Sequence, residues 1–168
     1  MTDRWEELEE RLRAVELRLG IGANKRPAVP DPETFWVLDG LRARGGEGVV
    51  FAGDVHTAAG PVAWQYGVPA DALLDTDEGG VEGDVEGAAG RLAALGHPVR
   101  LRLLLAVLRG ATGPAELAEE PGIGTSGQIY HHIRTLTAAG WLRASGRGQV
   151  QVPAERVVPL LVALATTL

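Results

Sequence analysis

Apolar residues recur at alternating spacings of three and four among the charged residues of segment 1–20, which predicts an amphipathic helix. With Trp5 at position a of a heptad, the candidate dimerisation residues of the a/d seam are Trp5, Leu8, Leu12 and Val15. Arginines at the g positions would face glutamates at e of a parallel neighbour, which favours a short parallel coiled coil. Packing of the helix on its own domain is the alternative, because two heptads are few for a stable coiled coil.

Residues 21–76 show the pattern of a small helix followed by a β-hairpin. The aspartate, proline and glutamate at 31–33 are typical of a helix start, and the glycine pair at 45–46 ends the predicted helix. Alternation of apolar and polar residues over 49–57, and again over 62–67, then predicts two antiparallel strands joined by a short turn.

Five of the chain's eight aromatic residues fall within this predicted module. They are Phe35, Trp36, Phe51, Trp64 and Tyr66. Two interpretations remain open: the rings fill the core of a small domain, or they line a pocket for a small-molecule effector.

The acidic, glycine-rich segment 77–90 is predicted to be a linker, with a helical C-terminal end as the open alternative, and a denser apolar pattern follows over 91–168. That pattern predicts a largely buried first helix, bent at Pro98 and ended by a glycine. A short second helix is predicted over 113–120, with Thr112 as its N-cap.

The third helix of this region is predicted from Thr125-Ser126-Gly127-Gln128, a sequence typical of a capping box. Its apolar residues at 129, 133 and 136 share one face, so the opposite face is expected to be exposed. That face contains no acidic residue and carries Gln128, Tyr130, His131 and Arg134. Such a surface is typical of a helix that lies in the major groove of DNA, where Gln pairs with adenine and Arg with guanine or phosphate.

A second hairpin and a final helix complete the predicted region. Segments 141–144 and 149–152 flank a glycine-rich turn that carries Arg147, placed to contact a phosphate or the minor groove. The last helix begins at Pro153 and is apolar on all sides, which predicts that it is buried against a second copy of the chain. Its candidate dimerisation residues are Val158, Leu161 and Leu164.

The phrases LGHPVRLRLL and HIRTLTAAGWL, with the glycine-tipped hairpin that follows them, resemble the ArsR-type (arsenic-repressor-like) winged helix-turn-helix regulators, in particular metal-independent actinobacterial members. The resemblance covers 91–168 and implies a homodimer joined through the first and last helices of this domain, with paired recognition helices on a two-fold-related operator. Carried over by position, it implies DNA contacts from Thr125, Ser126, Gln128, Tyr130, His131 and Arg134, and from Arg147 in the wing. Metal-sensing members carry paired cysteines or a zinc site on the last helix. This chain has no cysteine and offers only Glu155 there, so metal sensing is not expected.

The formal net charge of −6 is unevenly distributed, since residues 1–90 carry −10 and residues 91–168 carry +4. A locally basic half is what phosphate binding needs, so the distribution suits a DNA-binding half joined to an acidic half.

The sequence offers only weak candidates for catalysis or metal binding. His131 and His132 are adjacent on a helix and diverge by about 100°, so they cannot chelate one ion together. Asp54 and His56 share a strand face without a nucleophile, so no catalytic residue, metal or cofactor is expected.

The sequence therefore predicts an α+β chain: an N-terminal coiled-coil-like helix, a helix-and-hairpin module, and a winged helix-turn-helix with a terminal dimerisation helix. Segment 1–20 is too charged for a secretion signal, and no apolar run reaches the roughly 18 residues that span a bilayer, so a cytoplasmic location without membrane contact is expected. The expected function is a sequence-specific transcription regulator, not an enzyme, that binds double-stranded DNA as a homodimer. Tetramer formation through the first helix and control by an effector at 21–76 remain open. A protein–protein adaptor that keeps the winged-helix fold without binding DNA is the alternative.

Overall fold

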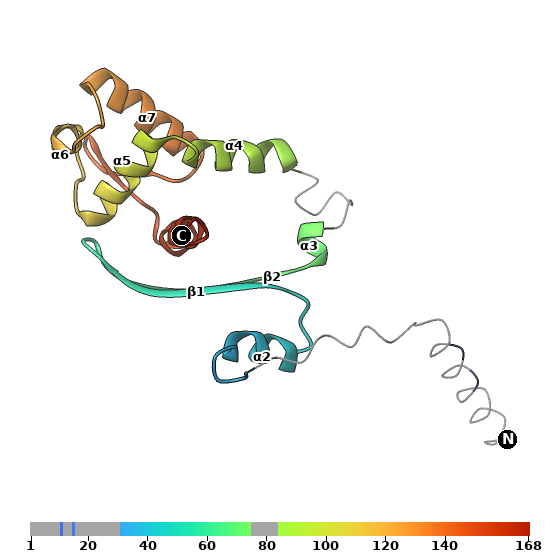
Figure 1. Cartoon of the computed structure of the whole chain (residues 1–168). Helices are drawn as coiled ribbons and strands as arrows, with labels where there is room; N and C mark the ends of the chain where they lie inside the picture. The colour runs from blue at the N-terminus through green and yellow to red at the C-terminus, as the bar shows by residue number, and fades with distance from the viewer. Residues whose placement is uncertain (1–10, 12–14, 16–30, 75–83) are drawn as a thin grey trace. The chain divides into compact units, whose positions relative to one another are not determined.

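The computed structural model of the chain describes residues 11, 15, 31–74 and 84–168 (Figure 1). Within this described part the protein is α+β, with seven helices and two antiparallel sheets of two strands each. None of the helices described there is both long enough and apolar enough to cross a lipid bilayer.

The first of two compact units, Met1–Gly45, contains the segment predicted to form an amphipathic helix. The seam residues Trp5, Leu8 and Leu12 lie outside the described residues. Val15 is helical, and its side chain is 51% exposed. The coiled coil therefore stays a prediction.

Helix α2 (Trp36–Ala43) follows the aspartate-proline start but begins later than predicted. The Asp31 carboxylate accepts a hydrogen bond from the backbone N–H of Glu33 (3.2 Å), and the Asp31 carbonyl accepts one from the N–H of Phe35 (2.8 Å). These bonds close a turn over 32–35 ahead of the helix, so the prediction of a proline at the first helical position is wrong. No residue of α2 is buried.

The second compact unit, Gly46–Leu168, opens with the predicted hairpin. Strands β1 (Gly48–Thr57) and β2 (Gly60–Pro69) pair antiparallel along their whole length, with Gly53 opposite Trp64. The alternating pattern therefore predicted both strands correctly, and β2 begins earlier and ends later than the pattern alone indicated.

Two helices follow the hairpin. Helix α3 (Asp71–Leu74) is a single turn, and α4 (Val85–Leu95) begins within segment 77–90. The acidic, glycine-rich segment is therefore helical from Val85 onward, which corrects the linker boundary at residue 90 and agrees with the alternative of a helical C-terminal end.

Helix α5 (Pro98–Arg109) is separate from α4, whereas the sequence pattern predicted one bent helix. The break is stabilised by His97, whose Nδ1 accepts a hydrogen bond from the backbone N–H of Val99 at 3.2 Å. A proline at the first helical position loses nothing by lacking an N–H, because that group has no partner within a helix. The same proline that suggested a kink thus starts a new helix.

Helices α6 (Pro114–Glu119) and α7 (Ser126–Ala138) are joined by the predicted glycine-containing turn at 121–124. The N-cap of α6 is Gly113 rather than Thr112, so that prediction is wrong by one residue. A short hairpin of β3 (Arg143–Gly146) and β4 (Gln149–Gln151) follows.

The last helix, α8 (Ala154–Ala165), completes one apolar core with α4 to α7. The side chains in this core with at most 2% exposure include Leu103, Leu104, Leu117, Ile129, Leu136, Leu142 and Leu160. The indole Nε1–H of Trp141, which follows α7, donates a hydrogen bond to the carbonyl of Arg91 in α4 at 2.9 Å. This bond connects the chain after α7 to α4.

Helix α8 lies between this helical core and the β1–β2 hairpin (Figure 1). Leu160 faces the core with 0% exposure, while Val158, 1% exposed, contacts the hairpin at Gly53. A Cβ atom at position 53 would lie 3.0 Å from both methyl groups of Val158, so the glycine permits this close approach. The apolar faces of α8 are therefore largely covered within the chain, and the predicted boundary between the hairpin module and 91–168 does not separate two compact units.

Candidate nucleic-acid interface

Helix α7 presents the predicted polar residues on its exposed side. Ile129 and Leu136 are fully buried and attach the helix to the core. The residues that stay exposed are Thr125, Ser126, Gln128, Tyr130, His131 and Arg134. Six of the seven predicted DNA-contact residues thus lie together on and just before one helix, and none of its residues is acidic.

The capping box at the start of α7 is formed as predicted, and it changes what Gln128 can do. Gln128 Oε1 accepts hydrogen bonds from the backbone N–H (2.9 Å) and the hydroxyl (3.3 Å) of Thr125. A Cβ atom at position 124, where φ is +99°, would lie 2.4 Å from the same oxygen, so Gly124 leaves room for the cap. While capped, Gln128 offers only its NH₂ group outward, so a two-point contact with adenine would require the cap to open.

Three histidines meet beside the N-terminal half of α7. The ring of His132 lies 4.8 Å from that of His97 and 5.6 Å from that of His131, measured between centroids. His132 Nδ1 is buried and has no hydrogen-bond partner among the described residues.

This environment disfavours the imidazolium form of His132. Burial is the main cause that holds the pKa of His132 below its ordinary value of 6.5. The positive charges of His97, Arg100 and His131 lower the pKa further. Among the described residues, no group of three or more His, Asp or Glu side chains is placed to hold a metal ion.

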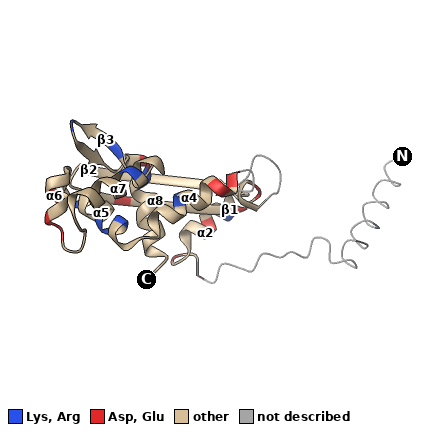
Figure 2. Cartoon of the chain, turned by 90° about the horizontal axis from the view of Figure 1, so that it is seen from above, with Lys and Arg blue, Asp and Glu red and all other residues tan. Residues whose placement is uncertain are grey.

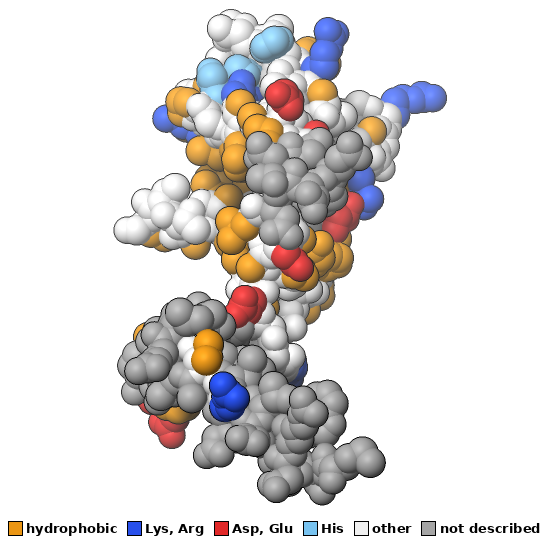
Figure 3. Space-filling model, turned by 90° about the vertical axis from the view of Figure 1, so that its right-hand side faces the viewer, with side chains coloured by type: hydrophobic (Ala, Val, Ile, Leu, Met, Phe, Trp, Pro, Cys, Tyr) orange, Lys and Arg blue, Asp and Glu red, His pale blue; other side chains and the backbone are white. Residues whose placement is uncertain are grey.

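The β3–β4 hairpin carries the seventh predicted contact residue. Arg147 is exposed at the turn, and Figure 2 shows a basic residue at the tip of this hairpin. Figure 3 shows histidine side chains close to lysine or arginine side chains at the upper end of the view. Within the described part of the chain neither Arg134 nor Arg147 forms an ion pair, so their charges are available to an anion.

The predicted dimerisation residues of α8 differ in their accessibility. Val158 is covered by the hairpin, because Gly53 packs on its methyl groups. Leu161 and Leu164 are half-buried and lie at the edge of the core. The expectation that α8 is buried chiefly by a second copy is therefore wrong for Val158.

The five aromatic residues proposed as an effector pocket are divided between the two units. Phe35 and Trp36 are exposed residues of the first unit. Three others, Phe51, Trp64 and Tyr66, line a surface pocket in the second unit beside α8, and the rings of Phe51 and Tyr66 are 5.8 Å apart. The structure thus brings three of the five together.

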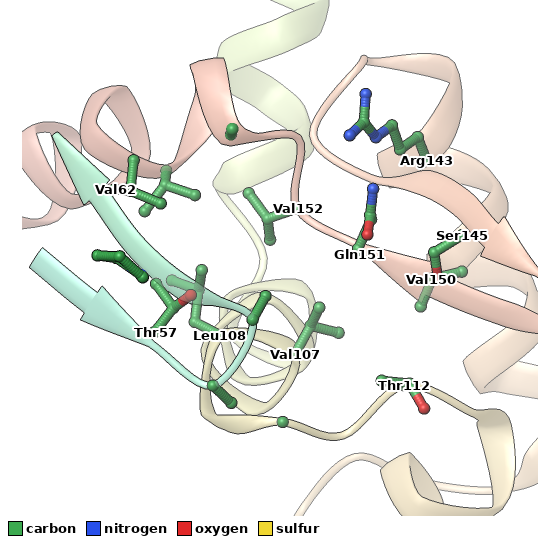
Figure 4. Close-up of a pocket in the computed structure, with 16 residues that line it drawn as sticks. Thr57, Val62, Val107, Leu108, Thr112, Arg143, Ser145, Val150, Gln151 and Val152 are labelled. Carbon is green, nitrogen blue, oxygen red and sulfur yellow. The ribbon is translucent and has the colours of Figure 1, made fainter. Parts of the chain in front are cut away.

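A second pocket, which the sequence analysis missed, lies where the β1–β2 turn, the end of α5 and the β3–β4 hairpin meet (Figure 4). Its volume is about 340 Å³. Arg143 and Gln151, which are paired across β3 and β4, stand at one side. Arg143, which pairs with the polar Gln151, and Ser145 are exposed polar residues of β3, and this is a local sign of a polar site at the strand.

Comparison of the chain with models of known protein families, with curated proteins and with solved structures finds no match.

Proposed function

We propose that residues 84–168 form a winged helix-turn-helix domain and that the protein is a transcription regulator that binds double-stranded DNA sequence-specifically. In this proposal α6 and α7 are the helix-turn-helix, α7 enters the major groove, and β3–β4 is the wing. The protein acts as a homodimer whose contacts along α8 use Leu161 and Leu164, since Val158 is already covered.

The exposed side of α7 is the observation that carries this proposal. It combines hydrogen-bonding side chains and an unpaired arginine with a complete absence of acidic residues, on a helix fixed to the core by Ile129 and Leu136. Arg147 on the adjoining hairpin supplies a second unpaired cation. Phosphate contacts from such arginines position a protein on DNA, while the side chains at the start of the helix read bases.

The test is selection of binding sites from a random duplex library, followed by fluorescence anisotropy of the enriched duplex and of a shuffled duplex. Titrations at about 50 and 150 mM salt separate specific binding from phosphate attraction, which falls steeply with salt. A regulator should retain a preference of at least about a thousandfold for the enriched duplex. If no duplex is enriched, or if the enriched and shuffled duplexes bind equally well at both salt concentrations, the proposal is wrong.

Matched arginine variants locate the interface. Arg147→Ala should weaken binding to both duplexes alike and reduce the salt slope by about one, as expected for a phosphate contact. Arg44→Ala removes the same charge from a residue that is not assigned to the interface and should leave binding unchanged. Equal losses in the two variants would show that only net charge matters.

Gln128 requires a pair of variants because of its cap. Gln128→Glu keeps an oxygen for Thr125 but loses the outward NH₂ group, whereas Gln128→Ala loses both. If Gln128 reads a base, both variants should discriminate less between the enriched and the altered base pair, by about 1–3 kcal/mol. If Gln128 only caps α7, Gln128→Ala alone should lower the free energy of unfolding, by about 1 kcal/mol.

The protein–protein adaptor remains the second candidate, and the exposed aromatic residues of the hairpin favour it. Trp64 is 38% exposed and Tyr66 is 52% exposed on the same strand. Tyr and Trp are enriched at protein interfaces. An adaptor should show no retention on DNA at low salt.

A further inference from the structure

We propose that the pocket between the β1–β2 turn and the β3–β4 hairpin is a binding site for a small carboxylic acid with a compact apolar body. None of the aromatic residues considered above lines it, although Arg143 borders both pockets, and it lies wholly within the second unit. Its volume of about 340 Å³ falls within the range of small-molecule sites, roughly 300–1,000 Å³.

The body of the pocket is apolar. Val62 from β2, Val107 and Leu108 from α5, and Val152 after β4 converge on it from three directions (Figure 4). Val107 and Val152 are each 8% exposed, so these walls belong to the packed core rather than to a mobile surface. Branched apolar walls of this kind favour an aliphatic or single-ring group.

The walls are fixed to one another by backbone hydrogen bonds. The N–H of Ala58 in the β1–β2 turn donates to the carbonyl of Leu108 at 3.1 Å. The N–H of Val150 in β4 donates to the carbonyl of Thr112 at 2.8 Å. The turn and the hairpin are thus both attached to the end of α5, and the site is formed before any ligand arrives.

The polar side of the pocket carries a positive charge without a counter-charge. Arg143 forms no ion pair within the described part of the chain, and none of the residues that line the pocket is acidic. Its guanidinium is held instead by Gln151. With the amide oxygen turned toward Arg143, Gln151 accepts hydrogen bonds from Nε at 2.7 Å and from Nη2 at 2.8 Å.

A glutamine is a significant partner for this arginine. It fixes the plane of the guanidinium as a glutamate would, but it brings no negative charge that would neutralise the arginine. Further N–H groups of the guanidinium stay free. The hydroxyl of Ser145 lies on the same side of the pocket (Figure 4). A planar anion that binds through charge-assisted hydrogen bonds suits this arrangement, and a carboxylate attached to an apolar group suits both halves of the site.

The experiment is a titration of the ¹⁵N-labelled full chain, observed by NMR, with isovalerate, hexanoate, benzoate and phenylacetate, and with phenylacetamide as the uncharged match of phenylacetate. At least one acid should bind with one-to-one saturation and a dissociation constant of about 1 mM or below, as expected for ligands of this size. The largest shifts should fall on the amides of Ala58, Val150 and Gln151. Phenylacetamide should bind about tenfold more weakly or not at all.

Three variants test the assigned chemistry. Arg143→Gln should abolish binding, while Arg147→Gln, which removes the same charge from the turn of the same hairpin, should leave it unchanged. Gln151→Glu replaces the side-chain NH₂ group with a carboxylate oxygen and keeps the size of the side chain. The new negative charge neutralises Arg143, so this variant should abolish binding while keeping the fold. The proposal is overturned if no acid at about 10 mM shifts the backbone amide signals of Ala58, Val150 and Gln151. It is also overturned if phenylacetamide binds as tightly as phenylacetate, or if Gln151→Glu binds the acids like the wild type.

A regulatory role for this site rests on the proposed function, but the binding test does not, because it involves no DNA. Arg143 and Gln151 belong to the hairpin that carries Arg147, so a bound acid should change the affinity for DNA, by about fivefold or more if the coupling is typical. Gln151→Glu should remove that response. Saturable acid binding with unchanged DNA affinity would refute the effector role and retain the site.

Discussion

The contact between Gly53 and Val158 predicts that a single methyl group on the hairpin destabilises the second unit. In Gly53→Ala the new Cβ would lie 3.0 Å from both Cγ1 and Cγ2 of Val158, whereas carbon atoms pack at about 3.5–4.0 Å. Valine in a helix has one strongly preferred rotamer, and Val158 is enclosed between hairpin and core. The strain can therefore be relieved only if the hairpin moves by about half an ångström or Val158 leaves its rotamer.

The expected magnitude follows from two opposing terms. Overpacking of this kind costs about 1–3 kcal/mol. Alanine restricts the unfolded chain more than glycine does, which stabilises the folded state by about 0.4–1 kcal/mol. We therefore expect Gly53→Ala to lower the free energy of unfolding by roughly 1–2 kcal/mol.

Urea denaturation followed by circular dichroism and tryptophan fluorescence measures this change. Gly67→Ala, on the partner strand, is the matched control, because its Cβ would meet Val50 at an ordinary 3.5 Å. Val158→Ala removes the two methyl groups, so adding Gly53→Ala to that variant should cost about 1 kcal/mol less than adding it to the wild type. If Gly53→Ala is as stable as Gly67→Ala and the double variant is strictly additive, the hairpin does not pack on α8 as described.

Three further predictions concern local chemistry. Glu116→Gln should lower the urea midpoint at neutral pH, because hydrogen bonds from backbone N–H groups at the start of α6 hold the pKa of Glu116 below its ordinary 4.5. Their contribution is present above that value and is lost as the pH falls through the folded-state pKa, so the variant should show a shallower decline in acid. For His132, whose folded-state pKa lies below 6.5, the free energy of unfolding should fall as the pH drops below 6.5. His132→Gln should remove this dependence in titrations over about pH 5–8. Trp141→Phe leaves the carbonyl of Arg91 without its indole donor and should cost about 1–3 kcal/mol, whereas Trp64→Phe, at an exposed position of β2, should cost less in the same urea assay.

Local patterns predicted the elements whose formation depends on neighbouring residues. Alternation over 49–57 and 62–67 predicted the first hairpin because successive side chains of a strand point to opposite faces. The capping box at Thr125 was predictable because its two partners lie three residues apart, and the structure contains the bond. Local signals were ambiguous at Pro98, since proline both kinks a helix and starts one. Only the His97 cap resolves that choice.

The sequence by itself therefore determined the α+β class, the first hairpin, the exposed side of α7 and the uneven charge. Tertiary structure alone decided that Val158 packs on a glycine more than a hundred positions earlier, and that Arg143 is held by a neutral glutamine beside an apolar pocket. The physical reason is that periodicity records which side of an element is apolar, but not which distant surface covers it. A largely apolar helix such as α8 satisfies the same burial requirement against a second copy or against its own hairpin, and at Val158 the close approach that Gly53 allows decides for the hairpin.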